Sequence, residues 1–169
     1  MNYTTTGLQF AQEAVNTTFN NRAGGGFNVT AAGNFTRNTA GAHAFHNAGT
    51  FNKSGTGTTS FNNVAFHNTG TVNLTGGTLE LNSGGSSSHP IEVPAGTTLN
   101  LGATFNFPST GRALGGAGTI NFKGGTQNLA GQFLPTGTVN FNAGTITIAN
   151  PIAPAVIGTL NSATVIFNA

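Results

Sequence analysis

A short motif, Gly-Thr-apolar-Asn-apolar, recurs along the chain and constrains its fold more than any other feature. Successive copies start 19 to 27 residues apart. The copies are GTFNK from Gly49, GTVNL from Gly70, GTINF from Gly118 and GTVNF from Gly137, with looser copies from Gly25, Thr97 and Gly158. A period of about 20 residues is typical of solenoids, in which each repeat forms one coil that stacks on the next.

Each period holds further short strands. GTVNL is followed by GTLEL at 77–81 and HPIEV at 89–93, and NSGGSSS at 82–88 is expected to be a corner loop. Three short strands per coil, joined by Gly, Asn and Pro corners, predict an all-β, right-handed parallel β-helix. We expect about eight coils of roughly 20 residues. Residues 1–24 are expected to form an N-terminal coil or cap, and residues 25–169 a single β-solenoid domain.

Alternation within the motif predicts which side chains point inward, because successive side chains of a strand face opposite sides. The apolar positions predict one inward core stack: Phe27, Phe51, Val72, Leu99, Ile120, Val139 and Leu160. The polar positions predict an outward Thr/Asn ladder, a possible contact face: Thr71, Asn73, Thr98, Asn100, Thr119, Asn121, Thr138, Asn140, Thr159 and Asn161. Stacked coils bring equivalent residues to about 4.8 Å from one another.

Two other amide patterns bear on the coils. Asn followed by Gly two residues later, as in Asn68-Thr69-Gly70, suits corners that stack their side-chain amides. Gln127 falls in a second inward column of apolar residues. It is either a buried, hydrogen-bonded amide or a sign that the predicted register is wrong there.

The charge content excludes several classes of function. The 169 residues include five Lys and Arg, three Asp and Glu, and no Cys, so neither a disulfide framework nor a Cys zinc site is possible. No basic cluster is present for nucleic acid, and a glycosidase needs two carboxyl groups about 5 to 10 Å apart. Glu80 and Glu92 are expected to be solvated surface residues. We therefore expect no enzyme, metal, cofactor or nucleic-acid partner, and no insertion into a membrane.

His46 and His67 stand 21 residues apart in AFHNAGTF and AFHNTGTV, one coil from each other. Each follows an inward Phe, so both imidazoles are expected to point outward, one above the other at about 5 Å. Two stacked histidines without a third ligand make a weak metal site. An exposed ladder is the favoured interpretation, with adventitious metal binding as the alternative.

The tandem GTFNK, GTVNL and GTLEL coils resemble the repeat regions of large bacterial surface adhesins, of the filamentous haemagglutinin and autotransporter-passenger kind. The resemblance covers residues from about Gly25 to Asn168. It implies a right-handed β-helix outside the cell or on its surface, although those proteins are far longer. The polar start MNYTTTGLQF has no signal-peptide pattern. A fragment, a processed subunit and a small protein exported by another route all stay open.

The last predicted strand, 164–167, carries no polar capping segment after it, and an open coil invites another coil to add to it. We therefore expect a non-catalytic structural solenoid, an adhesin or fibre segment or subunit that stacks end to end. Its expected partners are copies of itself, or glycans or proteins of a host or cell surface. The alternative is an ice-binding or polysaccharide-binding solenoid that uses the outward Thr/Asn face.

Overall fold

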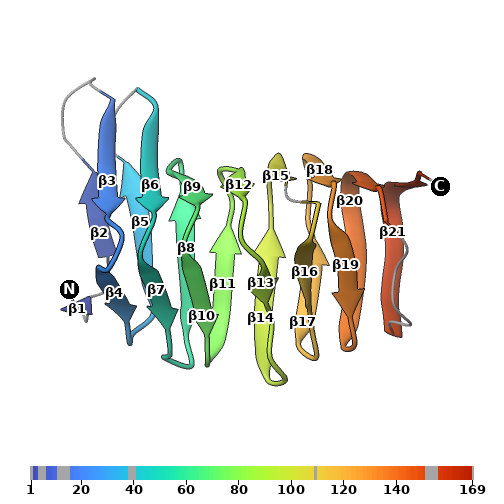
Figure 1. The fold of residues 1–169 in the computed structure, drawn as a ribbon, viewed down its shortest axis with the longest axis horizontal. Helices are drawn as coiled ribbons and strands as arrows, with labels where there is room; N and C mark the ends of the chain where they lie inside the picture. The colour runs from blue at the N-terminus through green and yellow to red at the C-terminus, as the bar shows by residue number, and fades with distance from the viewer. Residues whose placement is uncertain are drawn as a thin grey trace.

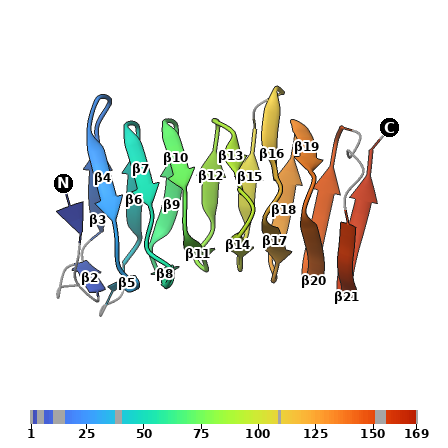
Figure 2. The ribbon, with the colours of Figure 1, turned by 90° about the horizontal axis from the view of Figure 1, so that it is seen from below.

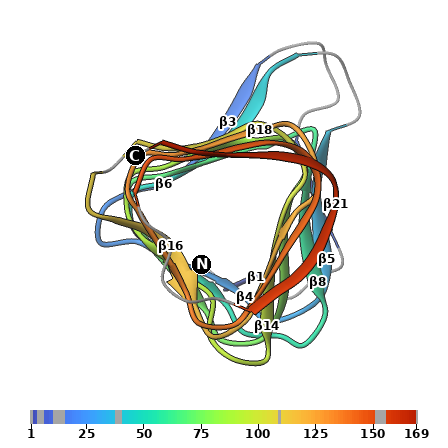
Figure 3. The ribbon, with the colours of Figure 1, turned by 90° about the vertical axis from the view of Figure 1, so that its right-hand side faces the viewer.

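The computed structural model describes residues 2–3, 7–10, 16–37, 41–108, 110–150 and 156–168 of the chain. Within these residues every regular element is a β-strand, and the strands pair in parallel. Seen end-on, the ribbon outlines a triangle (Figure 3). Along the long axis the strands lie side by side, with the two termini at opposite ends (Figures 1 and 2). The predicted parallel β-solenoid is therefore confirmed, and its handedness stays a prediction.

The triangle has three faces. The first face is a seven-stranded sheet in the order β1 (Asn2–Tyr3), β4 (Gly26–Val29), β7 (Thr50–Lys53), β10 (Thr71–Leu74), β13 (Ile91–Glu92), β16 (Arg112–Gly116) and β19 (Gln132–Pro135). One strand of this sheet per coil gives about seven turns, where the sequence predicted about eight.

The other two faces form one 14-stranded sheet that bends around a corner at β20 (Thr138–Ile148). The second face contains β2 (Gly7–Phe10), β5 (Gly33–Arg37), β8 (Thr58–Asn62), β11 (Gly77–Leu81), β14 (Thr97–Leu101), β17 (Thr119–Phe122) and the first half of β20. The third face contains β3 (Thr17–Asn21), β6 (His43–Asn47), β9 (Ala65–Asn68), β12 (Gly85–Ser87), β15 (Phe105–Phe107), β18 (Thr126–Leu129) and the second half of β20.

The last strand, β21 (Val156–Phe167), pairs with β20 along both halves. At the other end, the described part of residues 1–24 contributes β1, β2 and β3. These pair with β4, β5 and β6, so that each of the three faces begins one coil earlier than Gly25.

The glycine that begins the motif is required for steric reasons. A Cβ on Gly49 would overlap the carbonyl oxygen of Gly25, and one on Gly70 would overlap that of Gly49. Each corner therefore packs directly on the backbone of the coil before it, and any larger residue would separate the coils.

The interior of the first coils is built from phenylalanine. Phe35 and Phe61 stack with ring centroids 4.2 Å apart and an interplanar angle of 5°, and Phe27 stacks on Phe51 at 5.9 Å and 5°. All four rings are buried. Stacked aromatic columns thus hold adjacent coils in register.

The predicted core stack is wrong as a single column. Phe27, Phe51 and Val72 pair on the first face, whereas Leu99, Ile120 and Val139 pair on the second. All six are buried, but Leu160 is 62% exposed and pairs with Phe141. The true partner of Val72 in the next coil is Ile91.

An unexpected strand explains why the predicted column passes from the first face to the second. Residues Gly85–Ser87, predicted as a corner loop, form β12 on the third face. HPIEV therefore supplies β13, the first strand of the following coil. Gly85 occupies the inward position between Phe66 and Phe105, where its φ of 140° and the nearby Phe66 carbonyl exclude a side chain. The alternation of apolar and polar residues cannot predict a strand that has no apolar residue.

Candidate functional site

The central surface feature is a polar row on the second face, here called the surface ladder: Glu80, Asn100, Asn121 and Asn140. Nδ2 of Asn100 donates to Oε1 of Glu80 at 3.2 Å. Nδ2 of Asn121 donates to Oδ1 of Asn100 at 2.7 Å, and Asn140 donates likewise to Asn121 at 2.7 Å. The amides therefore bind successive coils to one another, as identical side chains do when they stack in register.

A threonine row runs beside the surface ladder. Thr98, Thr119 and Thr138 pair in register, as the sequence predicted, and Thr78 and Thr58 extend the row toward the N-terminus. Thr58 is exposed and the other four are half-buried. The row therefore places five hydroxyl groups in register along the second face.

Four predicted members of the Thr/Asn ladder lie elsewhere. Thr71 and Asn73 are on the first face, where Nδ2 of Asn73 donates to Asn52 at 2.8 Å. Thr159 pairs with Asn140 rather than Thr138, and Asn161 donates to Asn142. The register of β21 shifts between Val139 and Asn140, because Gly158 adds one residue there as a bulge.

Glu80 ends the surface ladder with a charge. Its carboxylate accepts hydrogen bonds from Nζ of Lys123 at 2.8 Å and from Oγ of Ser60 at 2.9 Å. Burial alone raises the pKa of this carboxyl, but the hydrogen bonds from Lys123, Ser60 and Asn100 and the charge of Lys123 lower it to about 2. Glu80 is thus a fixed anion that joins several coils.

Glu92 lies on the first face and forms a two-pronged ion pair with Arg112 of the next coil. Nε of Arg112 is 2.5 Å from Oε1 of Glu92, and Nη2 donates to Oε2 at 2.7 Å. Both side chains are about two-fifths exposed. The two glutamates of the described chain therefore lie on different faces, each beside its own cation.

The predicted histidine pair is present on the third face. The imidazoles of His46 and His67 stack with centroids 5.0 Å apart and an interplanar angle of 26°, and Nδ1 of His67 lies 3.0 Å from Oγ of Ser86. His46 is exposed and His67 is half-buried. Burial, and secondly the charge of His46, lower the pKa of His67. Within the described residues no three His, Asp or Glu side chains form a group that could hold a metal ion.

A second ladder is buried at the corner between the third and first faces, here called the buried ladder: Asn21, Asn47, Asn68 and Ser87. Nδ2 of Asn21 donates to Asn47 and that of Asn47 to Asn68, both at 2.7 Å. Nδ2 of Asn68 donates to Oγ of Ser87 at 2.9 Å. The stacked corner amides predicted from Asn68-Thr69-Gly70 are therefore confirmed.

Gln127 is the buried, hydrogen-bonded amide that one of the two interpretations predicted. It stands between Phe105 and Ile146 on the third face, with Nε2 donating to the carbonyl oxygens of Ala103 at 2.6 Å and Gly124 at 2.8 Å. The register is intact there, and the amide satisfies corner carbonyls from inside the coil.

Lys53 is a buried cation that the sequence interpretation missed. It occupies the inward position between Val29 and Leu74, and its Nζ donates to the carbonyl oxygens of Gly55 and, at 3.1 Å, of Gly76. Burial lowers its pKa. The signal was available, because GTFNK carries Lys where GGFNV and GTVNL carry an apolar residue.

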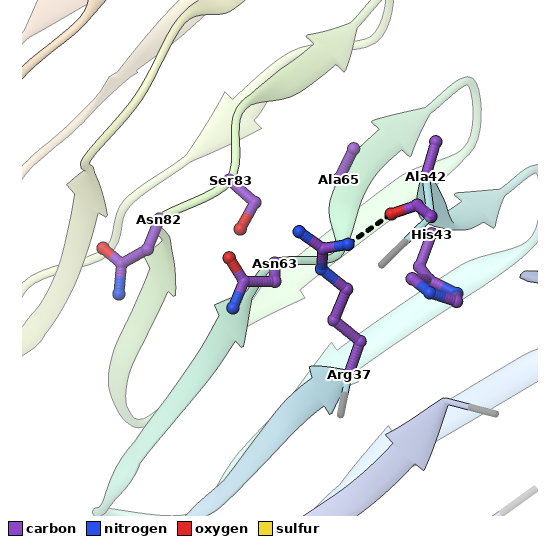
Figure 4. Close-up of a pocket in the computed structure, with 8 residues that line it drawn as sticks. Arg37, Ala42, His43, Asn63, Ala65, Asn82 and Ser83 are labelled. Carbon is purple, nitrogen blue, oxygen red and sulfur yellow. Dashed lines mark hydrogen bonds between the residues drawn. The ribbon is translucent and has the colours of Figure 1, made fainter. Parts of the chain in front are cut away.

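A polar pocket also escaped the sequence interpretation. It has a volume of about 390 Å³ and lies where the second, third and fourth coils meet (Figure 4). Its lining residues are Arg37, Gly41, Ala42, His43, Asn63, Ala65, Asn82 and Ser83. Five residues separate Arg37 from His43 in the second coil, whereas two separate Asn62 from Ala65 in the third. The described residues that line the pocket thus flank chain segments of different length in neighbouring coils.

Comparisons of the chain with protein-family models, with curated proteins and with solved structures find no match. The structure has the coiled β-solenoid architecture that the resemblance to bacterial surface adhesins implies. No helix long and apolar enough to span a membrane occurs in the described part of the chain.

Proposed function

We propose that the chain is a non-catalytic structural β-solenoid that acts outside the cell, as an adhesin or fibre segment or subunit, and stacks end to end on a further coil. The observation that carries this proposal is the open side of β21. Phe141 is 3% exposed and Ile148 is 1% exposed beneath β21, whereas Leu160 and Phe167, their partners in register, are 62% and 59% exposed.

The open side of β21 carries exposed apolar side chains in register with buried ones of β20. Leu160 and Phe167 continue buried columns, and full burial of each contributes about 1.5 to 3 kcal/mol. Within the described residues β21 has a strand neighbour, β20, on one side only. A further parallel strand would pair the outer edge of β21 and cover both side chains. The occupant is a coil of the same kind, from a second copy or from a longer chain.

The geometry of the ends supports a linear assembly. The first and last coils lie at opposite ends of the long axis (Figure 1). When one copy places its first coil on the last coil of another, the contact is heterologous, and such contacts form open filaments when the rotation does not close. Extracellular placement rests on the resemblance and on a nearly neutral, Cys-free chain.

Light scattering and electron microscopy of the chain across a range of concentrations test the stacking. We expect elongated particles whose mass rises with concentration and falls when Leu160→Lys and Phe167→Lys are combined. Thr71→Lys, on an exposed side position, adds a charge without touching the end and should leave assembly unchanged. A monodisperse 17.0 kDa monomer at high concentration contradicts self-stacking.

Ice binding through the second face is the alternative that a specific observation favours. Thr58, Thr78, Thr98, Thr119 and Thr138 form one row in register, with neighbours about 4.8 Å apart. This alternative predicts thermal hysteresis that disappears when Thr119 and Thr138 are replaced by tyrosine. The same variants should not alter end-to-end assembly, so the two functions are distinguishable.

A further inference from the structure

We propose that the pocket between the second, third and fourth coils binds a carboxylated sugar, with Arg37 as its carboxylate ligand. Its volume of about 390 Å³ falls within the range of small-molecule sites, about 300 to 1,000 Å³. The proposal is independent of the open side of β21, because no pocket residue belongs to that strand.

The guanidinium of Arg37 is held at the pocket wall. Its Nη1 donates to the carbonyl oxygen of Gly41 at 2.5 Å, and Figure 4 shows the group between Asn63 and His43. This bond fixes the direction of a planar, permanently charged fork whose geometry matches a carboxylate.

The remaining polar groups suit hydroxyls. Asn63, Asn82 and Ser83 line the side of the pocket across from His43, and both carboxamides and the hydroxyl donate and accept hydrogen bonds. Asn82 and Ser83 are held by bonds from Nδ2 to Asn62 at 2.9 Å and from Oγ to the Phe61 carbonyl at 3.3 Å. A polyol offers matched donors and acceptors. A nucleobase would need an aromatic side chain to stack on, and among the described lining residues the only ring is the buried His43 imidazole.

Asn63 adds a backbone feature to the site. It has a φ of 59°, the left-handed region, and is the non-glycine residue with positive φ in the described chain. Its side chain is exposed at the pocket. Asn63 lies in a two-residue corner, where glycine would adopt the positive φ equally well without a side chain. An asparagine there retains a carboxamide that the turn itself does not require.

Titration of the full, isotope-labelled chain with trigalacturonate, followed by NMR, tests the proposal, with maltotriose as the neutral probe. We expect saturable shifts of the backbone amides at 41–43, 63–65 and 82–83 with trigalacturonate, and binding at least about tenfold weaker with maltotriose. Arg37→Gln should weaken trigalacturonate binding about tenfold and Asn63→Gly about threefold.

Arg22→Gln is the matched control, because it removes the same charge from an exposed corner that does not line the pocket. If Arg37→Gln fails to fold, Arg37→Lys replaces it: the charge stays, the fork is lost, and binding should still weaken. The absence of saturable binding overturns the proposal, and so do equal affinity for maltotriose and equal weakening by Arg22→Gln. If the galacturonate monomer shifts the same amides, one carboxylated sugar unit is enough for binding and a polymer is not needed.

Discussion

Nδ2 of Asn47 donates a 2.7 Å hydrogen bond to Oδ1 of Asn68, one coil away, inside a corner where both amides are 1% exposed. Nδ2 of Asn47 also donates to the carbonyl oxygen of Thr71 at 3.0 Å. The buried ladder therefore joins four coils through a few side-chain atoms. Its members are short, so little rotamer entropy opposes the arrangement.

Asn47→Leu should destabilise the fold by about 2 to 3 kcal/mol, because it leaves Asn21, Asn68 and the Thr71 carbonyl without their partner in a dry corner. Urea unfolding followed by circular dichroism measures the loss. Asn52→Leu makes the same change in the half-buried ladder of the first face and should cost under about 1 kcal/mol. Equal costs would show that burial does not set the strength of the ladder.

Gln127→Glu should be destabilising at neutral pH by about 3 kcal/mol or more, because a buried carboxylate would face the carbonyl oxygens of Ala103 and Gly124. Burial raises the pKa of such a carboxyl. The folded variant then binds a proton that the unfolded chain releases, so its stability should rise as pH falls toward 5.

Thermal unfolding between pH 5 and 8 checks the sign. Asn128→Asp, the same chemical change at the exposed neighbour on β18, should cost under about 1 kcal/mol and show little pH dependence over this range. A Gln127→Glu variant as stable at pH 8 as at pH 5 would contradict the burial of this amide.

The repeat period, the parallel solenoid and the inward-outward alternation were predictable. Each follows from a short motif that recurs along the sequence and alternates polar and apolar residues. The single core column was not. The first and second faces carry the same Thr-apolar-Asn-apolar pattern, so TVNL of β10 and TLNL of β14 appear equivalent although they lie on different faces. The 27-residue interval from Gly70 to Thr97 was one coil plus one strand.

The pocket and the bulge depend on relations between coils. The pocket is lined by residues of three coils, which come together only when the coils are stacked. Gly158 begins a looser copy of the motif, yet the register of β21 follows its apolar residues and makes that glycine a bulge. A five-residue motif does not contain this information.

His46→Asn should raise the pKa of His67 toward its usual value of about 6.5, because the charge of His46 is one of the causes that lower it. His67 binds its proton less readily in the folded state, so stability is full above the unfolded pKa and declines as pH falls below about 6.5. NMR titration of the two imidazoles measures both pKa values. An unchanged pKa of His67 in His46→Asn would mean that burial alone lowers it. Asn20→Ser is the control, because Asn20 pairs with His46 on the side away from His67.

Glu80 makes the folded chain sensitive to strong acid. Its pKa of about 2 lies below the usual glutamate value of 4.5, so the unfolded chain binds the proton more readily, and stability present above pH 4.5 is lost as pH falls through 2. Because the carboxylate links Lys123, Ser60 and Asn100, Glu80→Gln should cost about 1 to 3 kcal/mol at pH 7 and remove this part of the acid sensitivity. Unfolding measured at pH 7, 4 and 2 checks both statements. Glu92→Gln breaks the more exposed ion pair with Arg112 on the first face and should cost under about 1 kcal/mol, because water screens that pair. If the two variants lose the same stability at pH 7, the ladder around Glu80 adds nothing to an ordinary surface ion pair.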